Sequence, residues 1–354
     1  MEERSGSSPR PKRPKFGNAL DRISSLHDSI LHKILSCLPT EDAVKTSCLS
    51  KRWRRLWTSV PDLSFCNRRG CGRVSDFVAF VDETLNLYSS SGNLDKFLID
   101  FDYISRYACY VDKWVHFAFC HNVEKLHLAF YGTLNANHTL LMSGYQHHCY
   151  CYLLPQHVCT NSSLKMLTLR FCNFAPKPSI CWPSLTVLWI GYVSLTNDLI
   201  QYILLGSPEL IELRLYNFQL QGNYEGNYEV YITSTSLQNL QLDGDRGLAN
   251  DESSYLLEIS APNLQSLSIS GFMYRRTFRL KNVLSLFEAK LSFGRIVGFG
   301  RNAYLVHQIL LEELLEKLRH VHKLTISTWC LQAKEWSVPP ATFEFKSFLS
   351  PIKL

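Results

Sequence analysis

A short apolar pattern, Leu-x-x-Leu-x-Leu or a close variant, recurs along most of the chain. In its second half apolar and polar positions alternate, which is the period of a β-strand with one buried face. Eight copies begin at Leu94, Val123, Leu164, Leu185, Leu210, Leu237, Leu264 and Val321. Between residues 164 and 264 successive copies start 21, 25, 27 and 27 residues apart. This recurrence predicts an array of repeats that contribute one strand each.

Spacings of about 20–29 residues with this pattern are typical of leucine-rich repeats. In such an array the leucines of each strand point inward and stack on the leucines of the next repeat. Eight copies in register argue against chance recurrence. We therefore predict an α/β leucine-rich-repeat solenoid over residues 94–330, with residues 283–291 as a degenerate copy.

The residues between the inward leucines should face the concave side of this solenoid, because side chains alternate along a strand. These residues are His127, Thr168, Arg170, Trp189, Arg214, Tyr216, Gln241 and Asp243. Tryptophan, arginine and tyrosine dominate the energetics of protein interfaces. The candidate target-binding residues are therefore His127, Arg170, Trp189, Arg214 and Tyr216.

Residues 19–62 instead show the spacing of short helices. We predict a first helix capped by Asp28 and ended by Pro39, and further helices capped by Thr40 and Ser50. The apolar face of the first helix is Leu31, Ile34, Leu35 and Leu38. Three helices in about forty residues are too few for a self-sufficient core, so a neighbouring segment or a partner must cover their apolar faces.

Three runs of this segment closely resemble the F-box, especially that of the large plant F-box family. They are Asp21-Arg22-Ile23-Ser24-Ser25-Leu26, Ile34-Leu35-Ser36-Cys37-Leu38-Pro39 and Ala43-Val44-Lys45-Thr46-Ser47-Cys48-Leu49-Ser50-Lys51-Arg52-Trp53. The resemblance implies docking onto a Skp-type adaptor, which in turn binds a cullin and a RING subunit. The positions of the adaptor-facing pattern are Leu26, Ile34, Leu38, Pro39, Val44, Cys48 and Trp53. One departure is His27, where the family commonly has proline after leucine.

The resemblance implies a substrate-recognition subunit of an SCF-type (Skp–cullin–F-box) E3 ubiquitin ligase, which is not itself an enzyme. The departure at His27 motivates the alternative of a leucine-rich-repeat scaffold that recruits no ligase. The expected fold is α+β and multi-domain. Its parts are a disordered basic tail (1–18), the F-box (19–62), a helical linker (63–93), the solenoid (94–330) and a C-terminal segment (331–354). A related family carries a further small domain, called FBD, after the repeats; we expect it to be absent or cut short here, with the last segment in the second case being its start.

Charge and composition narrow the location and the partners. The formal net charge is +6, and residues 1–16 contribute 5 − 2 = +3 of it, so charge predicts no nucleic-acid-binding surface. The basic run with Lys12, Arg13 and Lys15 resembles a nuclear localisation signal. No long apolar stretch predicts a membrane span or a secretion signal, and twelve scattered cysteines read as reduced thiols. We expect a protein of the nucleus, the cytoplasm or both, with an unknown target protein as partner.

One cluster invites a metal hypothesis. His147, His148, Cys149 and Cys151 lie close to His157 and Cys159, in the long interval between two repeats. The Cys-x-Cys spacing lacks the usual gap of a zinc knuckle, and no second knuckle follows, so a loop insertion is favoured over a zinc-dependent enzyme. No motif predicts a cofactor or a catalytic residue.

Overall fold

The computed structural model describes residues 23, 25–67, 72–89, 92–132, 151–175, 177–220, 228–244, 255–271, 276–293 and 301–327. The basic run with Lys12, Arg13 and Lys15 lies outside these residues, as does the segment 331–354.

The chain begins with a compact helical module. Its elements are α1 (Asp28–Ser36), α2 (Thr40–Lys45), and the 3-10 helices η1 (Thr46–Cys48) and η2 (Trp53–Ser59). Two expectations need correction. His27, and not Asp28, caps α1, and the third helix is a 3-10 helix.

A long parallel sheet follows the module. Its strands, in spatial order, are β1 (Asp62–Asn67), β2 (Lys96–Tyr103), β3 (Lys125–Gly132), β5 (Met166–Arg170), β7 (Val187–Gly191), β9 (Glu212–Leu220), β11 (Asn239–Gly244), β13 (Ser266–Gly271), β15 (Glu288–Phe293) and β16 (Lys323–Ile326). Neighbours along this order are parallel and in register; Leu167, for example, lies opposite Leu188, which lies opposite Leu213. The repeat pattern therefore predicted the register of the sheet correctly.

The sheet starts before the predicted boundary at residue 94. In β1, Leu63 and Phe65 are buried and alternate with more exposed residues, and the strand pairs with β2. Val60, Leu63 and Phe65 fit the same pattern as Val123, Leu126 and Leu128, but this copy falls at the boundary between the predicted F-box and the predicted helical linker. At the other end, the degenerate copy forms β15, in which Ala289 occupies the place of an inward leucine.

A second layer covers one face of the sheet. It contains α3 (Val74–Leu87), η3 (Ser105–Tyr107), α4 (Ala108–Cys120), α5 (Gln156–Cys159), α6 (Asn197–Gly206) and α7 (Arg301–Lys317). Short strands lie between these helices in the sequence. Strand β4 (Tyr152–Leu153) pairs with β6 (Cys172–Asn173), and β8 (Ser194–Leu195) pairs with the end of β9. Further along the chain, β10 (Tyr228–Thr233), β12 (Tyr255–Ser260) and β14 (Arg276–Lys281) form a three-stranded parallel sheet. These segments are rich in aromatic and β-branched residues at period two, which favours strands over helices.

The inward leucines and one face of α3, α4, α5, α6 and α7 form a single hydrophobic cluster. All of these helices therefore lie on the same side of the large sheet. We call the opposite side, which carries the residues between the inward leucines, the open face. It corresponds to the predicted concave side.

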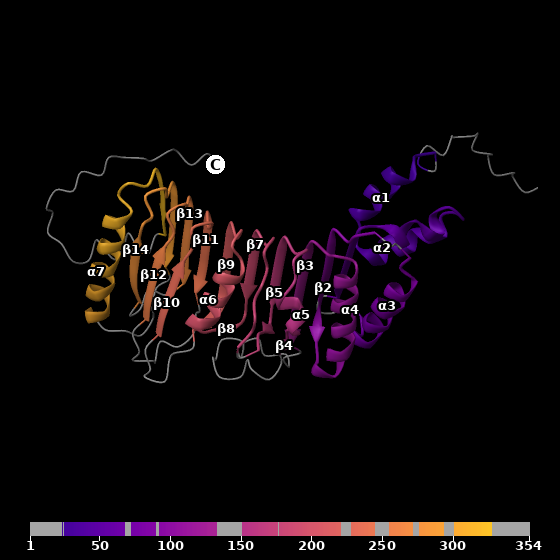
Figure 1. Cartoon of the computed structure of the whole chain (residues 1–354), viewed down its shortest axis with the longest axis horizontal. Helices are drawn as coiled ribbons and strands as arrows, with labels where there is room; N and C mark the ends of the chain where they lie inside the picture. Colours follow the sequence, from indigo (N-terminus) through magenta and orange to yellow (C-terminus); the bar gives the residue numbers. More distant parts are fainter. Residues whose placement is uncertain are drawn as a thin grey trace, which may run out of the picture.

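The helical module sits against the first strand, at the end of the sheet opposite α7 (Figure 1). The hydroxyl of Thr40 accepts a hydrogen bond of 2.7 Å from the backbone N–H of Ser64 in β1. The hydroxyl of Tyr88 donates one of 3.0 Å to the carbonyl of Val60. The module thus caps the N-terminal end of the solenoid. No helix in the described part of the chain has the length and apolar character needed to cross a bilayer.

Candidate functional site

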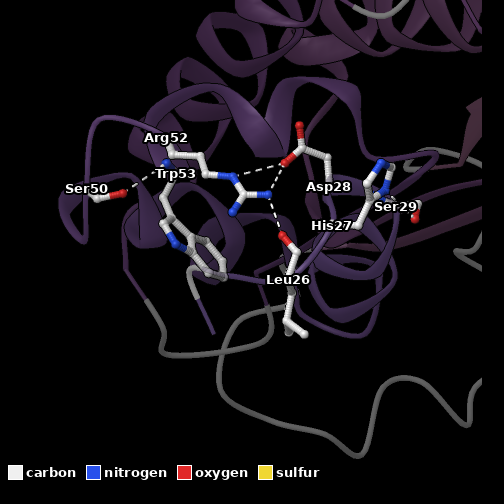
Figure 2. Close-up of polar contacts among 7 residues, drawn as sticks. All are labelled: Leu26, His27, Asp28, Ser29, Ser50, Arg52 and Trp53. Carbon is white, nitrogen blue, oxygen red and sulfur yellow. Dashed lines mark hydrogen bonds and ion pairs between the residues drawn. The ribbon is translucent and has the colours of Figure 1, made fainter. Parts of the chain in front are cut away.

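Polar contacts fix the entry to α1 (Figure 2). The backbone of His27 is extended, and its Nδ1 accepts a hydrogen bond of 3.3 Å from the N–H of Ser29. An imidazole nitrogen thus takes the role that a serine or aspartate side chain usually has at a helix start. Where the F-box commonly has proline, this chain therefore starts α1 with a capping histidine, His27.

Arg52, the residue before η2, contacts the start of α1. Its guanidinium pairs with the carboxylate of Asp28 and donates to the carbonyl of Leu26 (Figure 2). Through its hydrogen bond to the carboxylate, Arg52 lowers the pKa of the Asp28 carboxyl below its ordinary value. Next to it, the hydroxyl of Ser50 accepts a bond of 3.5 Å from the N–H of Trp53. These contacts set the direction of α1 relative to the rest of the module.

The core of the module is small and is separate from that of the solenoid. Its buried side chains are Leu31, Leu35, Ala43, Trp53, Leu56, Trp57 and Val60. Trp53, one of the predicted adaptor contacts, is only 5% exposed and belongs to this core. Its expected place on the surface needs correction, because the side chain is buried in the same cluster as Leu31 and Leu35 of α1.

The other predicted adaptor contacts divide into two groups. Ile34, Pro39 and Cys48 are exposed. Leu26, Leu38 and Val44 are half-buried and pack against the core of the module.

Two further exposed apolar residues of the module do not belong to the predicted set. Ile34 is 42% exposed, while Ile30 and Leu49 are 45% and 65% exposed. We call Ile30 and Ile34 the apolar patch. Ile30 and Ile34 are four residues apart and share a face of α1, so helical periodicity is the sequence signal that links Ile30 to the predicted contact.

On the open face, the predicted target-binding residues occupy neighbouring strands. His127, Thr168, Trp189, Arg214 and Gln241 form one row of register partners. A second row contains Arg170, Tyr216 and Asp243. All are half-buried except Thr168, which is 1% exposed. Thr168 is therefore not an accessible contact, because it lies between the larger side chains of His127 and Trp189.

Trp189 and Arg214 share a carboxylate that the predicted set does not include. The indole N–H of Trp189 donates to Glu212 at 2.9 Å, and the guanidinium of Arg214 pairs with the same oxygen at 2.5 Å. The guanidinium also lies over the indole ring, 4.5 Å from its centroid. Arg214 is thus neutralised by a neighbour within its own strand.

Arg170 has tyrosines as partners. Its Nε donates to the hydroxyl of Tyr216 at 2.7 Å, and its Nη1 donates to the hydroxyl of Tyr131 at 3.1 Å. Tyr131 stands outside the predicted set because it lies past the short Leu-x-Leu core of its repeat. The structure thus brings together Trp189 with Arg214, and Arg170 with Tyr216.

Comparison with known proteins matches both regions. Residues 23–65 match the F-box domain, and residues 89–220 match the At1g61320/AtMIF1 LRR domain. The F-box protein At5g03100 of Arabidopsis thaliana is 30% identical over 90% of this chain and 92% of its own length. F-box/LRR-repeat protein 25 of the same plant is 31% identical, over 75% of this chain and 92% of its own length.

The chain belongs to the plant F-box/LRR family.

Not all F-box/LRR relatives have the same extent. F-box/LRR-repeat protein At5g02910 of Arabidopsis thaliana is 31% identical over 89% of this chain, but this chain spans only 62% of its length. No solved structure matches the chain. F-box/LRR proteins are generally non-catalytic substrate adaptors of SCF ligases, in which the F-box binds a Skp-type adaptor and the repeats bind targets.

The metal hypothesis concerns residues that are only partly described in this F-box/LRR protein. His147, His148 and Cys149 lie outside the described residues. Cys151, His157 and Cys159 are placed, and no three described His, Cys, Asp or Glu side chains gather as metal ligands. Burial raises the pKa of Cys159 to about 11, so its thiol stays protonated near neutral pH.

Proposed function

We propose that this chain is the substrate-recognition subunit of an SCF-type E3 ubiquitin ligase. It binds a Skp-type adaptor through the F-box, and through that adaptor a cullin and a RING subunit. The open face of the solenoid holds the target protein. The chain performs no bond chemistry of its own, and its contribution is to keep the target close to the ubiquitin-loaded enzyme.

The apolar patch carries this proposal. The core of the module closes without Ile30 or Ile34, so these side chains are left for a partner. Full burial of a leucine or isoleucine side chain is worth about 1.5–3 kcal/mol. Covering the exposed part of two such side chains would therefore favour binding, and polar residues around them would set the register.

The direct test is binding of a purified Skp-type adaptor, measured by titration calorimetry. Ile34→Asp places a charge in the patch without touching the core, and we expect the affinity to fall by a factor of at least about 100. Leu205→Asp, at an exposed leucine on α6, is the matched control and should bind like the intact chain.

A folded intact chain that fails to bind the adaptor would contradict the proposal. It would leave the alternative of a leucine-rich-repeat scaffold without ligase recruitment. Equal losses in both variants would also contradict it, since the effect would then not arise at the patch. The capped start of α1 at His27 supports the ligase proposal over that alternative.

We also propose that the chain acts in the nucleus, the cytoplasm or both, from the basic run containing Lys12, Arg13 and Lys15. A fluorescent fusion of the full chain should be found in the nucleus and should leave it when all three are changed to alanine. An unchanged distribution would remove the role of this run.

A further inference from the structure

One arginine in the middle of the open face lacks a counter-charge among the described residues. Arg170 is half-buried, and its guanidinium donates to the neutral hydroxyls of Tyr131 and Tyr216. No carboxylate in the described part of the chain lies within ion-pair distance of this guanidinium. Burying a charge without an opposite charge is unfavourable, so this position favours an incoming anion.

Two other cations of these repeats, Arg214 in β9 and Lys165 directly before β5, differ from Arg170 because each has a carboxylate partner. Arg214 is paired with Glu212, and Lys165 is paired with Glu124 at 2.7 Å. Burial alone would lower the pKa of Arg170, but the phenolic oxygens of Tyr131 and Tyr216 outweigh it, so the pKa is raised. Burial raises the pKa of Tyr216 to about 12, so this partner stays neutral and the arginine keeps its full charge.

The position of Tyr216 is set by the backbone beneath it. A Cβ on Gly191 would overlap the atoms of the Tyr216 ring, so the ring lies directly over the glycine of the adjacent strand. The guanidinium of Arg170 lies against the same ring, 5.3 Å from its centroid. Glycine at this position lets the ring and the guanidinium meet across β7.

Aromatic rings from the ends of β5 and β7 pack beside Tyr216. Tyr192 meets Tyr216 edge-on at 5.9 Å and stacks on Phe171 at 4.3 Å. Phe171 and Tyr192 have φ angles of 54° and 56°, a conformation that bulky residues rarely adopt. Asn217, which follows Tyr216, has the same conformation with a φ of 46°, so this bend recurs at the same place in three successive repeats.

We propose that Arg170, Tyr131, Tyr192 and Tyr216 form a receptor for the carboxylate of an aspartate or glutamate in an acidic segment of the target protein. This inference rests on the proposed function, because it assigns the chemistry of the target. A guanidinium has five N–H donors, of which two are used here, and the remaining three suit a carboxylate. The tyrosine rings supply the rigid apolar walls that interface hot spots use.

The charge selects a carboxylate over a phosphorylated residue. A phosphate carries about two negative charges near neutral pH and is usually met by a cluster of arginines. Arg170 supplies a single positive charge to this site, because Arg214 is already neutralised by Glu212. A single carboxylate matches that charge.

The probe is a library of random twelve-residue unmodified peptides, selected on the purified intact chain. We expect the recovered peptides to share an aspartate or glutamate. Arg170→Gln should weaken binding of a synthetic recovered peptide by at least about tenfold, and replacing the peptide's acid by its amide should do the same. Arg279→Gln, at an exposed arginine of β14, is the matched control and should leave the affinity unchanged.

Four results would overturn the receptor: no peptide recovered above background, recovered peptides without an acid, unchanged binding by Arg170→Gln, or tighter binding of the phosphoserine version. If Arg170→Gln fails to fold, Tyr131→Phe removes one hydroxyl only and should still weaken peptide binding by a few-fold. The selection needs no adaptor. Failure of adaptor binding with successful peptide binding would therefore remove the ligase role and keep this site, and the converse result would remove this site alone.

Discussion

The F-box and the solenoid differ in the size of their hydrophobic cores and in the side chains that they expose. The F-box closes a core of seven side chains and leaves Ile30, Ile34 and Leu49 in solvent. The solenoid stacks its leucines into one continuous cluster, and its open face carries half-buried arginine, tyrosine and tryptophan side chains. Exposed apolar side chains on the F-box suit binding to one constant partner, such as the proposed adaptor. A face built of aromatic and charged side chains suits recognition of a specific target, because unpaired polar groups penalise a wrong one.

The largest expected loss of stability tests whether the F-box core and the solenoid core unfold independently. Trp53→Ala should cost about 3–5 kcal/mol, because it empties the centre of a seven-residue core. A module this small has little stability to lose, so the F-box should unfold while the solenoid stays folded. Hydrogen exchange should rise across residues 25–60 and remain slow in β5 to β11.

Leu169→Ala is the matched change in the solenoid core, where the leucine is fully buried. It should speed exchange in the neighbouring repeats and leave the F-box protected. If Trp53→Ala instead removed protection from the whole chain, the two regions would form a single cooperative unit and the contrast between them would fail.

Alternation along the strands predicts which residues share a face, and the register of Leu167, Leu188 and Leu213 agrees with it. It does not predict how crowded a position is, so Thr168 is expected on the accessible surface although His127 and Trp189 flank it. Helical spacing has the same limit in α1, where the pairs Leu31/Leu35 and Ile30/Ile34 both lie four residues apart. Only the packing of the 3-10 helices decides which pair is buried. Contacts between distant residues, such as those of Arg170 with Tyr131, leave no local pattern.

The next effect concerns the junction between the regions. Thr40→Val keeps the shape of the side chain but leaves the N–H of Ser64 without its acceptor, which should cost about 1–3 kcal/mol because the site is buried. Thr46→Val is the control, since that hydroxyl donates within the module, from η1 to the carbonyl of Ala43 in α2 at 2.6 Å. Thermal unfolding should show a larger loss for Thr40→Val. A larger loss in Thr46→Val would mean that the junction does not couple the two regions.

A change on the open face should have a similar or smaller cost. Gly191→Ala forces the Tyr216 ring away from the adjacent strand and should destabilise the chain by about 1–3 kcal/mol. The clash disappears when the ring is removed, so Gly191→Ala should be nearly neutral in a Tyr216→Ala background. The double-mutant cycle, measured by chemical denaturation, checks this. Additive effects would show that the ring does not depend on the glycine.

The smallest effect is at the exposed entry to the F-box. Arg52 lowers the pKa of Asp28, so the pair contributes stability above the ordinary pKa of an aspartate, and this contribution is lost as pH falls through the lowered value. Both side chains are substantially exposed, so Arg52→Gln should change the melting temperature only slightly at neutral pH, and less still at high salt. An NMR titration of the Asp28 carboxyl should show its pKa return toward the ordinary value in this variant. Because Arg52 also donates to the carbonyl of Leu26, the variant should increase hydrogen exchange at the first turn of α1. An unchanged titration would assign the low pKa to another group, and unchanged exchange would mean that His27 holds the start of the helix without Arg52.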